Sequence, residues 1–170
     1  MKKVLGVLFV ALMMFPVNGM FAGGKDFYWS EVKQLTWKDY KKEADKNSKR
    51  KARSSMGIII MPSQKDDETM TANVYAIFSV EKSTKPNKDG QTDDALHHEQ
   101  TRFDLAEDHA RIERTQLPDS TYKTVGKFYL IAQKINKDAN RDFLADSKKY
   151  DEETKCGAGT AAQKKWDQYV

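Results

Sequence analysis

The feature that most constrains this chain is the pattern of apolar and polar residues from Ala95 to Leu117. At about 100° per residue, apolar side chains gather on one side of the circumference and charged side chains on the other. This pattern predicts an amphipathic helix with a wide inward face. Asp93 and Asp94 are residue types that begin helices, and Pro118 marks the end. The fold must therefore bury one face of a long helix.

The same helix carries part of a zinc-protease motif. In H-E-x-x-H, two histidines one helical turn apart bind zinc, and the Glu activates a water molecule. His98 and Glu99 match the first two positions, but Arg102 occupies the place of the second histidine. Arg stays protonated and has no available lone pair, so it cannot bind zinc.

The helical periodicity separates the histidines. His97 is expected to face solvent, whereas His98 is expected to point inward beside Arg102 and His109. His98 and His109 are eleven residues apart in the sequence, or about 16 Å along a helix axis, which is too far to share one zinc ion. An inward His is more often a hydrogen-bonded core residue than a metal ligand, and the sequence leaves both roles open for His98.

Residues 1–22 are predicted to be a secretory signal peptide. Lys2 and Lys3 precede an apolar run over residues 4–15, which is too short to span a bilayer comfortably, and small residues follow. Residues 23–170 are then expected to form a single domain with no transmembrane segment. The mature protein is expected to be exported, to the periplasm or to the medium.

The net charge and the cysteine content argue against nucleic-acid binding and against a disulfide-stabilised fold. The leader takes two lysines with it, so the formal net charge falls from +4 to +2. This balance does not indicate nucleic-acid binding, and the basic run at residues 41–53 is interpreted as a solvated loop. Cys156 is the chain's one cysteine, so no intramolecular disulfide can form. It is expected to be buried, metal-bound or paired with another molecule.

The remaining pattern predicts an α+β fold. Residues 57–61 indicate a buried strand, and residues 71–80 indicate a second strand, antiparallel to it through a polar turn at residues 63–68. Ser120 is expected to cap a second long helix that packs antiparallel to the first. A short last helix is expected from Thr160 to Trp166. The predicted architecture is a small antiparallel sheet packed against two long antiparallel helices.

Three separated segments together resemble a known family. They read L-T-W-K-D-Y from Leu35, H-E-Q-T-R-F-D-L-A-E-x-x-A-R from His98, and Y-D-x-E-T-x-C-G…Q-x-x-W from Tyr150. In order and spacing they are similar to a family of uncharacterised bacterial exported proteins predicted to be zinc-dependent proteases. Its central motif usually reads H-E-Q-x-H-F-D, and its C-terminal motif usually carries His before Gly.

The resemblance implies a zincin-like active helix in which His98 is a metal ligand and Glu99 the catalytic general base. Arg102 replaces the second ligand, and Cys156 stands where the C-terminal His is expected but could still bind zinc as a thiolate. His98 and Cys156 supply two ligands, one short of the usual catalytic three.

Three functions follow as hypotheses. The first is an exported protein whose zinc site has degraded and which binds a protein or peptide partner; it predicts an ion pair between Arg102 and Glu99. The second is an active metallopeptidase with zinc held by His98, Cys156 and a further group. The third is a structural, envelope-associated module.

Overall fold

The computed structural model describes residues 26–44, 52–64, 69–118, 120–121 and 125–170. The predicted leader and most of the predicted basic loop lie outside these ranges. The described strands are β1 (Phe27–Tyr28), β2 (Lys42–Glu43), β3 (Met56–Gln64), β4 (Thr69–Phe78), β5 (Thr84–Lys85) and β6 (Ser120–Thr121). The helices are η1 (Trp37–Asp39), η2 (Lys88–Gly90), α1 (Asp93–Gln116), α2 (Val125–Glu153) and α3 (Thr160–Asp167).

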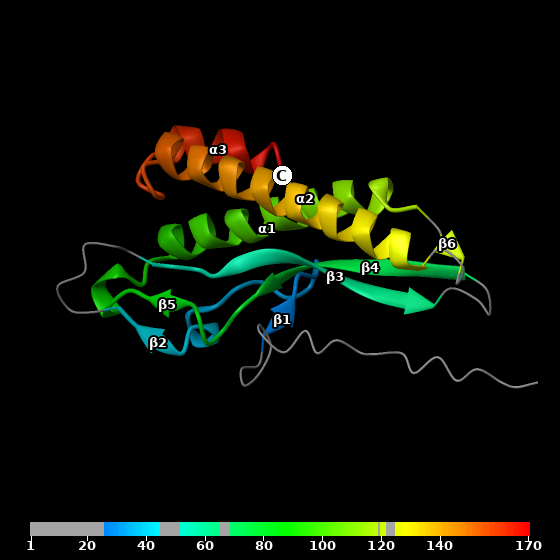
Figure 1. Ribbon diagram of the computed structural model, residues 1–170. Coiled ribbons are helices and arrows are strands. Elements are labelled where there is room, and N and C mark those ends of the chain that lie inside the picture. The colour runs from blue at the N-terminus through cyan, green and yellow to red at the C-terminus, as the bar shows by residue number, and fades with distance from the viewer. Residues whose placement is uncertain (1–25, 45–51, 65–68, 119, 122–124) are drawn as a thin grey trace, which may run out of the picture.

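The architecture confirms the α+β prediction. An antiparallel sheet packs against the long helices α1 and α2, and the short helix α3 lies beside them (Figure 1). β4 is the central strand, paired along its length with β3 and at its two ends with β1 and β6. None of the described helices combines the length and the apolar character needed to cross a bilayer.

The core lies between the sheet and the helices. Val74, Ala76 and Phe78 alternate along β4 and are buried, as their period-2 spacing predicts. Phe103 of α1 and Phe143 of α2 pack into the same cluster. The alternating residues of β4 therefore set the surface against which α1 and α2 are positioned.

Two element predictions were wrong. Ser120 does not cap the second helix, because it pairs with Met70 in β6 and α2 begins only at Val125. The strand at residues 57–61 is not fully buried either, because β3 is an edge strand and Met61 is exposed. In both cases the outcome depends on which distant strand the segment pairs with, and the local sequence pattern does not specify that partner.

Helix α2 covers part of the edge of β3 with a side-chain amide. The Ile58 N–H donates to Asn140 Oδ1 at 3.0 Å, and Asn140 Nδ2 donates to Ile58 O at 2.8 Å. The amide of Asn140 therefore pairs with both backbone groups of Ile58 at this strand edge, and Asn136 Nδ2 also donates to Ile58 O, at 3.2 Å. It also fixes α2 along the sheet.

Asn140→Ala is expected to lower the free energy of unfolding by about 2 kcal/mol, because the Ile58 N–H loses its side-chain acceptor and Ile58 O loses one of its two side-chain donors. Thermal or urea unfolding of the purified variant measures the change. Asn73→Ala, on the exposed side of β4, is the matched control and should shift stability by about 0.5 kcal/mol or less. Equal losses in the two variants would contradict the role assigned to Asn140.

Candidate functional site

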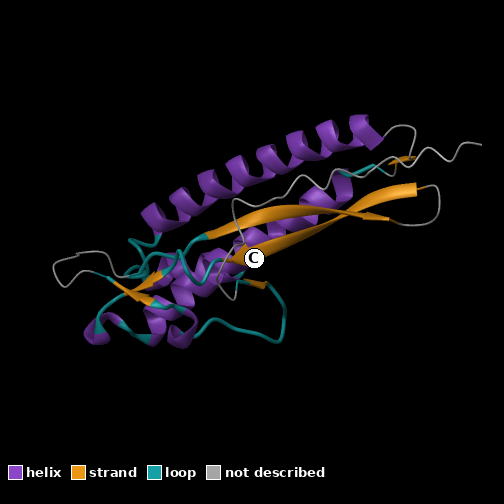
Figure 2. Ribbon diagram, turned by 60° about the horizontal axis from the view of Figure 1, so that its bottom comes forward, coloured by secondary structure: helices purple, strands orange, loops and turns teal. Residues whose placement is uncertain are grey.

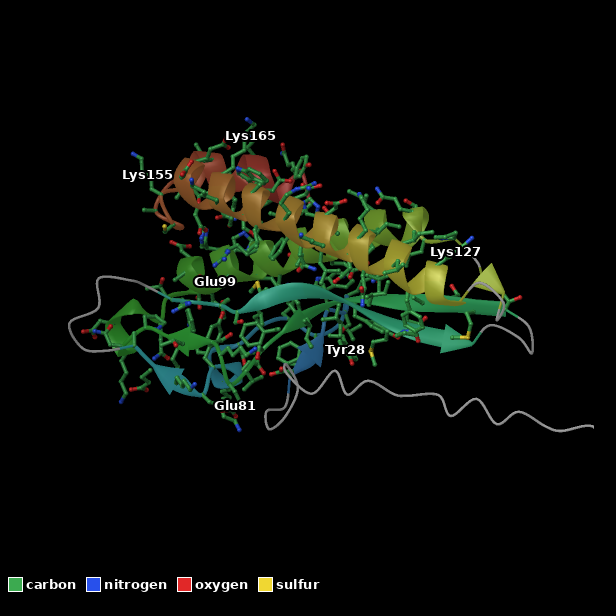
Figure 3. The ribbon with its side chains drawn as sticks, in the orientation of Figure 1. Tyr28, Glu81, Glu99, Lys127, Lys155 and Lys165 are labelled. Carbon is green, nitrogen blue, oxygen red and sulfur yellow. The ribbon has the colours of Figure 1, made fainter. Side chains whose placement is uncertain are left out.

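The residues of the H-E-x-x-R segment lie near the N-terminal end of α1. The Thr92 side chain accepts a hydrogen bond from the Ala95 N–H, so Thr92 caps the helix, and Asp93 and Asp94 are the acids of its first turn. His97 is exposed, as predicted, whereas His98 and Glu99 are each 4% exposed. Figure 3 labels Glu99 at the same end of the molecule as Lys155 and Lys165. The helix thus presents His98 and Glu99 to the interior.

His98 is held by three residues of the C-terminal part of the chain. Its Nε2 atom lies 3.1 Å from Asp151 Oδ1, and its Nδ1 atom lies 3.4 Å from Thr154 Oγ1. The imidazole stacks on the ring of Tyr150, with 4.4 Å between ring centroids and 14° between ring planes. Both ring nitrogens therefore have protein partners, as expected of a hydrogen-bonded core histidine.

Arg102 lies between two carboxylates. Its Nη1 atom donates to Glu99 Oε2 at 3.2 Å, and its Nε atom lies 3.7 Å from Asp151 Oδ1. The ion pair predicted between Arg102 and Glu99 is therefore present. Asp151 is shared, because the same Oδ1 atom faces His98 and Arg102. This group of four residues, His98, Glu99, Arg102 and Asp151, is called the α1–α2 polar centre below.

The turn that carries Cys156 packs against His98. Lys155, Cys156 and Gly157 have φ angles of 52°, 53° and 86°, all in the left-handed region. A Cβ atom at Gly157 would lie 3.1 Å from the Cβ atom of His98, so the glycine allows this close approach. The structure thus brings the Cys156–Gly157 turn to His98, although the Cys156 residue itself is exposed.

The donor set around His98 does not fit a three-ligand zinc site. Among the described residues, no group of three or more His, Cys, Asp or Glu side chains is placed to hold a metal ion. Arg102 supplies a cation where a ligand is needed. His109 lies in a separate contact between α1 and α2, where its Nε2 atom is 3.0 Å from Asp146 Oδ2.

The N-terminal motif also reaches this region. Thr36 and Asp39 cap η1 through reciprocal hydrogen bonds. The Leu35 N–H donates to Gln100 Oε1 at 2.7 Å. Burial raises the pKa of Tyr40, and the nearby negative charge of Glu99 raises it further. The three motif segments, far apart in the sequence, therefore meet around α1.

A second polar network joins α1 to α3. Gln163 Nε2 donates to Thr101 Oγ1 at 3.1 Å and to Asp167 Oδ1 at 2.7 Å, and His97 Nε2 lies 3.0 Å from the Asp167 carboxylate. Burial alone would raise the pKa of Asp167, but the hydrogen bonds from His97 and Gln163 outweigh it and hold that pKa below its usual range. Asp167 is thus a charged partner at neutral pH.

Sequence reasoning missed Asp151, Thr154 and Gln163 as site residues. All three belong to the quoted C-terminal motif, Y-D-x-E-T-x-C-G…Q-x-x-W, but that motif drew attention to Cys156 alone. Carboxylates are common second partners of histidine nitrogens, and Asp151 was the signal that could have been used.

A groove of about 350 Å³ lies beside these networks, between α2 and α3. Trp166 and Tyr169 provide aromatic surface, and Lys149 and Lys165 provide positive charge. The lining carboxylates are engaged, since Glu153 accepts from Trp166 Nε1 and Asp146 faces His109. The groove therefore offers aromatic and cationic contacts to a ligand.

Comparisons of the chain with models of protein families, with curated proteins and with solved structures found no match.

Proposed function

We propose that this protein is an exported, zincin-like binding protein in which an ion-pair network has replaced the metal site of a zinc-dependent protease. The proposal rests on the resemblance of the three motif segments and on their meeting around α1. It assigns the chain a protein or peptide partner and no catalytic turnover of its own.

The observation that carries the proposal is the placement of Arg102. A catalytic general base must be available to a metal-bound water molecule. Glu99, the residue matched to that base, instead accepts a hydrogen bond from the Arg102 guanidinium at 3.2 Å. The Arg102 cation pairs with Glu99 and lies 3.7 Å from Asp151, so a positive charge from the protein itself occupies the place of the second metal ligand.

The same centre predicts how zinc binding could be restored. Arg102→His should create affinity for about one zinc ion per chain, since two imidazoles would then lie one helical turn apart, facing Asp151. The unmodified protein should bind none. Zinc titration calorimetry, with elemental analysis of protein purified without chelators or metal-binding tags, measures both. The matched control is Arg111→His, on the exposed part of α1, which should gain no zinc.

Three results would count against the proposal. Stoichiometric zinc in the unmodified protein would favour the metallopeptidase hypothesis, and peptide hydrolysis lost in Glu99→Gln without loss of folding would establish it. Failure of Arg102→His to gain zinc, in a folded protein, would contradict the match between Arg102 and the second ligand position.

A further inference from the structure

Helix α2 has an exposed face that the core does not use. Its inward side chains, such as Phe128, Ala132 and Phe143, are buried against the rest of the protein. On the outward side, Leu130 is 70% exposed and Leu144 is 61% exposed. Figure 2 shows α2 running along the edge of the molecule. Both leucines lie on the solvated face of α2, where the core gives them no partner.

The same face is rich in cations. Five exposed basic residues accompany the two leucines: Lys127, Lys134, Lys137, Arg141 and Lys148. At about 100° per residue, these seven side chains fall within about 100° of the circumference, over roughly 32 Å of helix. Lys127 marks one end of this surface, opposite the end of the molecule where Lys155 lies (Figure 3). We call these seven residues the α2 outer face.

Nearby acids neutralise only part of this charge. Asp138 lies 2.7 Å from Lys134 and 2.8 Å from Arg141, and Glu152 lies 3.8 Å from Lys148. Asp142 also pairs with Arg141. Lys127 and Lys137 form no ion pair with the residues that the structure describes. Five cations thus face three carboxylates, and the surface keeps a positive balance that attracts an anionic partner.

We propose that the α2 outer face is a docking site for the surface of an anionic lipid bilayer. A helix lying in the membrane interface combines basic residues, which attract anionic headgroups, with apolar residues that enter the headgroup and acyl boundary. The α2 outer face has both kinds of residue on the same side of one helix. The helix lies on the surface and does not span the bilayer.

The chemistry disfavours two other occupants. A second copy of this chain would bring the positive balance of one α2 outer face against that of another. Its seam would also carry Lys137 midway between Leu130 and Leu144, where a paired helix needs an apolar residue. A nucleic acid would satisfy the cations but leave both leucines in water. Of these three occupants, the lipid surface is the one that uses the two kinds of side chain together.

The test is cosedimentation with lipid vesicles. It uses the chain from Gly23, which contains every described helix and strand and lacks the apolar run of residues 4–15 that would itself bind lipid. Binding is expected to vesicles in which about one third of the lipid is phosphatidylglycerol and the rest phosphatidylcholine. It should be lost on pure phosphatidylcholine and at roughly 1 M NaCl, where the Debye length is about 3 Å.

Two pairs of substitutions separate the contributions. Lys127→Gln with Lys137→Gln should weaken vesicle binding about 25-fold, at about fivefold for each cation. Leu130→Gln with Leu144→Gln should weaken it at least about tenfold, because the apolar contribution is lost. Lys38→Gln with Lys88→Gln, and Val32→Gln at a residue that is 94% exposed, are matched controls that should leave binding unchanged. Circular dichroism verifies folding of each variant.

Several results would overturn the proposal. Absence of binding to phosphatidylglycerol vesicles is one, and an equal loss in the control variants is another. If vesicle binding is lost in the lysine variants but kept in the leucine variants, the α2 outer face would be an electrostatic surface for a different polyanion. A dimer detected by light scattering and abolished by Leu130→Gln, without vesicle binding, would make the α2 outer face an interface between two copies.

Discussion

Arg102→Met is expected to lower the free energy of unfolding by about 3 kcal/mol. The substitution keeps an unbranched side chain but leaves Glu99, which is 4% exposed, as a buried carboxylate without its cation. Removing one partner of a buried ion pair is strongly destabilising for this reason. For a domain of this size, the melting temperature should fall by roughly 6–12 °C.

A second substitution, at Glu99, tests whether the loss of stability comes from the ion pair. In the double variant Arg102→Met with Glu99→Gln, no buried charge is left unpaired, and replacing a buried ion pair by neutral residues is often nearly neutral. Most of the loss should therefore be recovered, giving a coupling free energy of about 2 kcal/mol in a double-mutant cycle. Urea unfolding of the four proteins measures the cycle.

The control for this cycle is an ion pair on the surface of α2. Lys148 and Glu152 are both exposed and lie 3.8 Å apart. Lys148→Met should change stability by about 0.5 kcal/mol or less, because solvent screens this pair. If the stability lost in the double variant equals the sum of the losses in the Arg102→Met and Glu99→Gln single variants, the two charges are not coupled. The ion pair between Arg102 and Glu99 would then not contribute to the stability of the α1–α2 polar centre.

The elements predicted most accurately are those whose signal is local. The periodicity of residues 95–117 gave α1 within a few residues, and the alternation of Val74, Ala76 and Phe78 gave the buried face of β4. The short helix α3, expected from Thr160 to Trp166, runs from Thr160 to Asp167. Each of these patterns is repeated within one segment, so no distant partner is needed to interpret it.

The residues missed are those whose role depends on a distant partner. Ser120 has the chemistry of a helix cap, but pairing with Met70 places it in the sheet. Asp151 belongs to the quoted C-terminal motif, but its role becomes clear only from its contact with His98, 53 residues away in the sequence. The pairing of Arg102 with Glu99 could be predicted because both residues lie on one helix, three positions apart.

Tyr150 contacts all three helices beside the α1–α2 polar centre. Its removal is expected to lower the free energy of unfolding more than Arg102→Met does. The residue is fully buried, and the single proton of its hydroxyl is shared by two acceptors, Gln163 Oε1 at 2.6 Å and His98 O at 3.2 Å. Its ring also meets Trp166 edge to face, with 5.3 Å between centroids. This one side chain of α2 therefore contacts both α1 and α3, and we expect it to stabilise the packing of the three helices.

Tyr150→Ala should lower the free energy of unfolding by about 4 kcal/mol, since it removes a buried aromatic ring and leaves a cavity. Tyr150→Phe keeps the ring and should cost about 1.5 kcal/mol, the effect of leaving two acceptors without their donor. Tyr169→Ala, at a tyrosine that is 66% exposed, is the matched control and should have little effect. Chemical denaturation of the three variants gives these values.

The hydroxyl also makes the stability of the protein depend on pH in the alkaline range. Burial raises the pKa of Tyr150 above its ordinary value of about 10, so the folded protein keeps this proton where the unfolded chain releases it. Stability should therefore fall as pH rises through about 10, because the folded state then binds more protons than the unfolded state. Tyr150→Phe should make this fall shallower. An unchanged alkaline slope in Tyr150→Phe would show that this hydroxyl is not the buried donor that fastens α3 to α1.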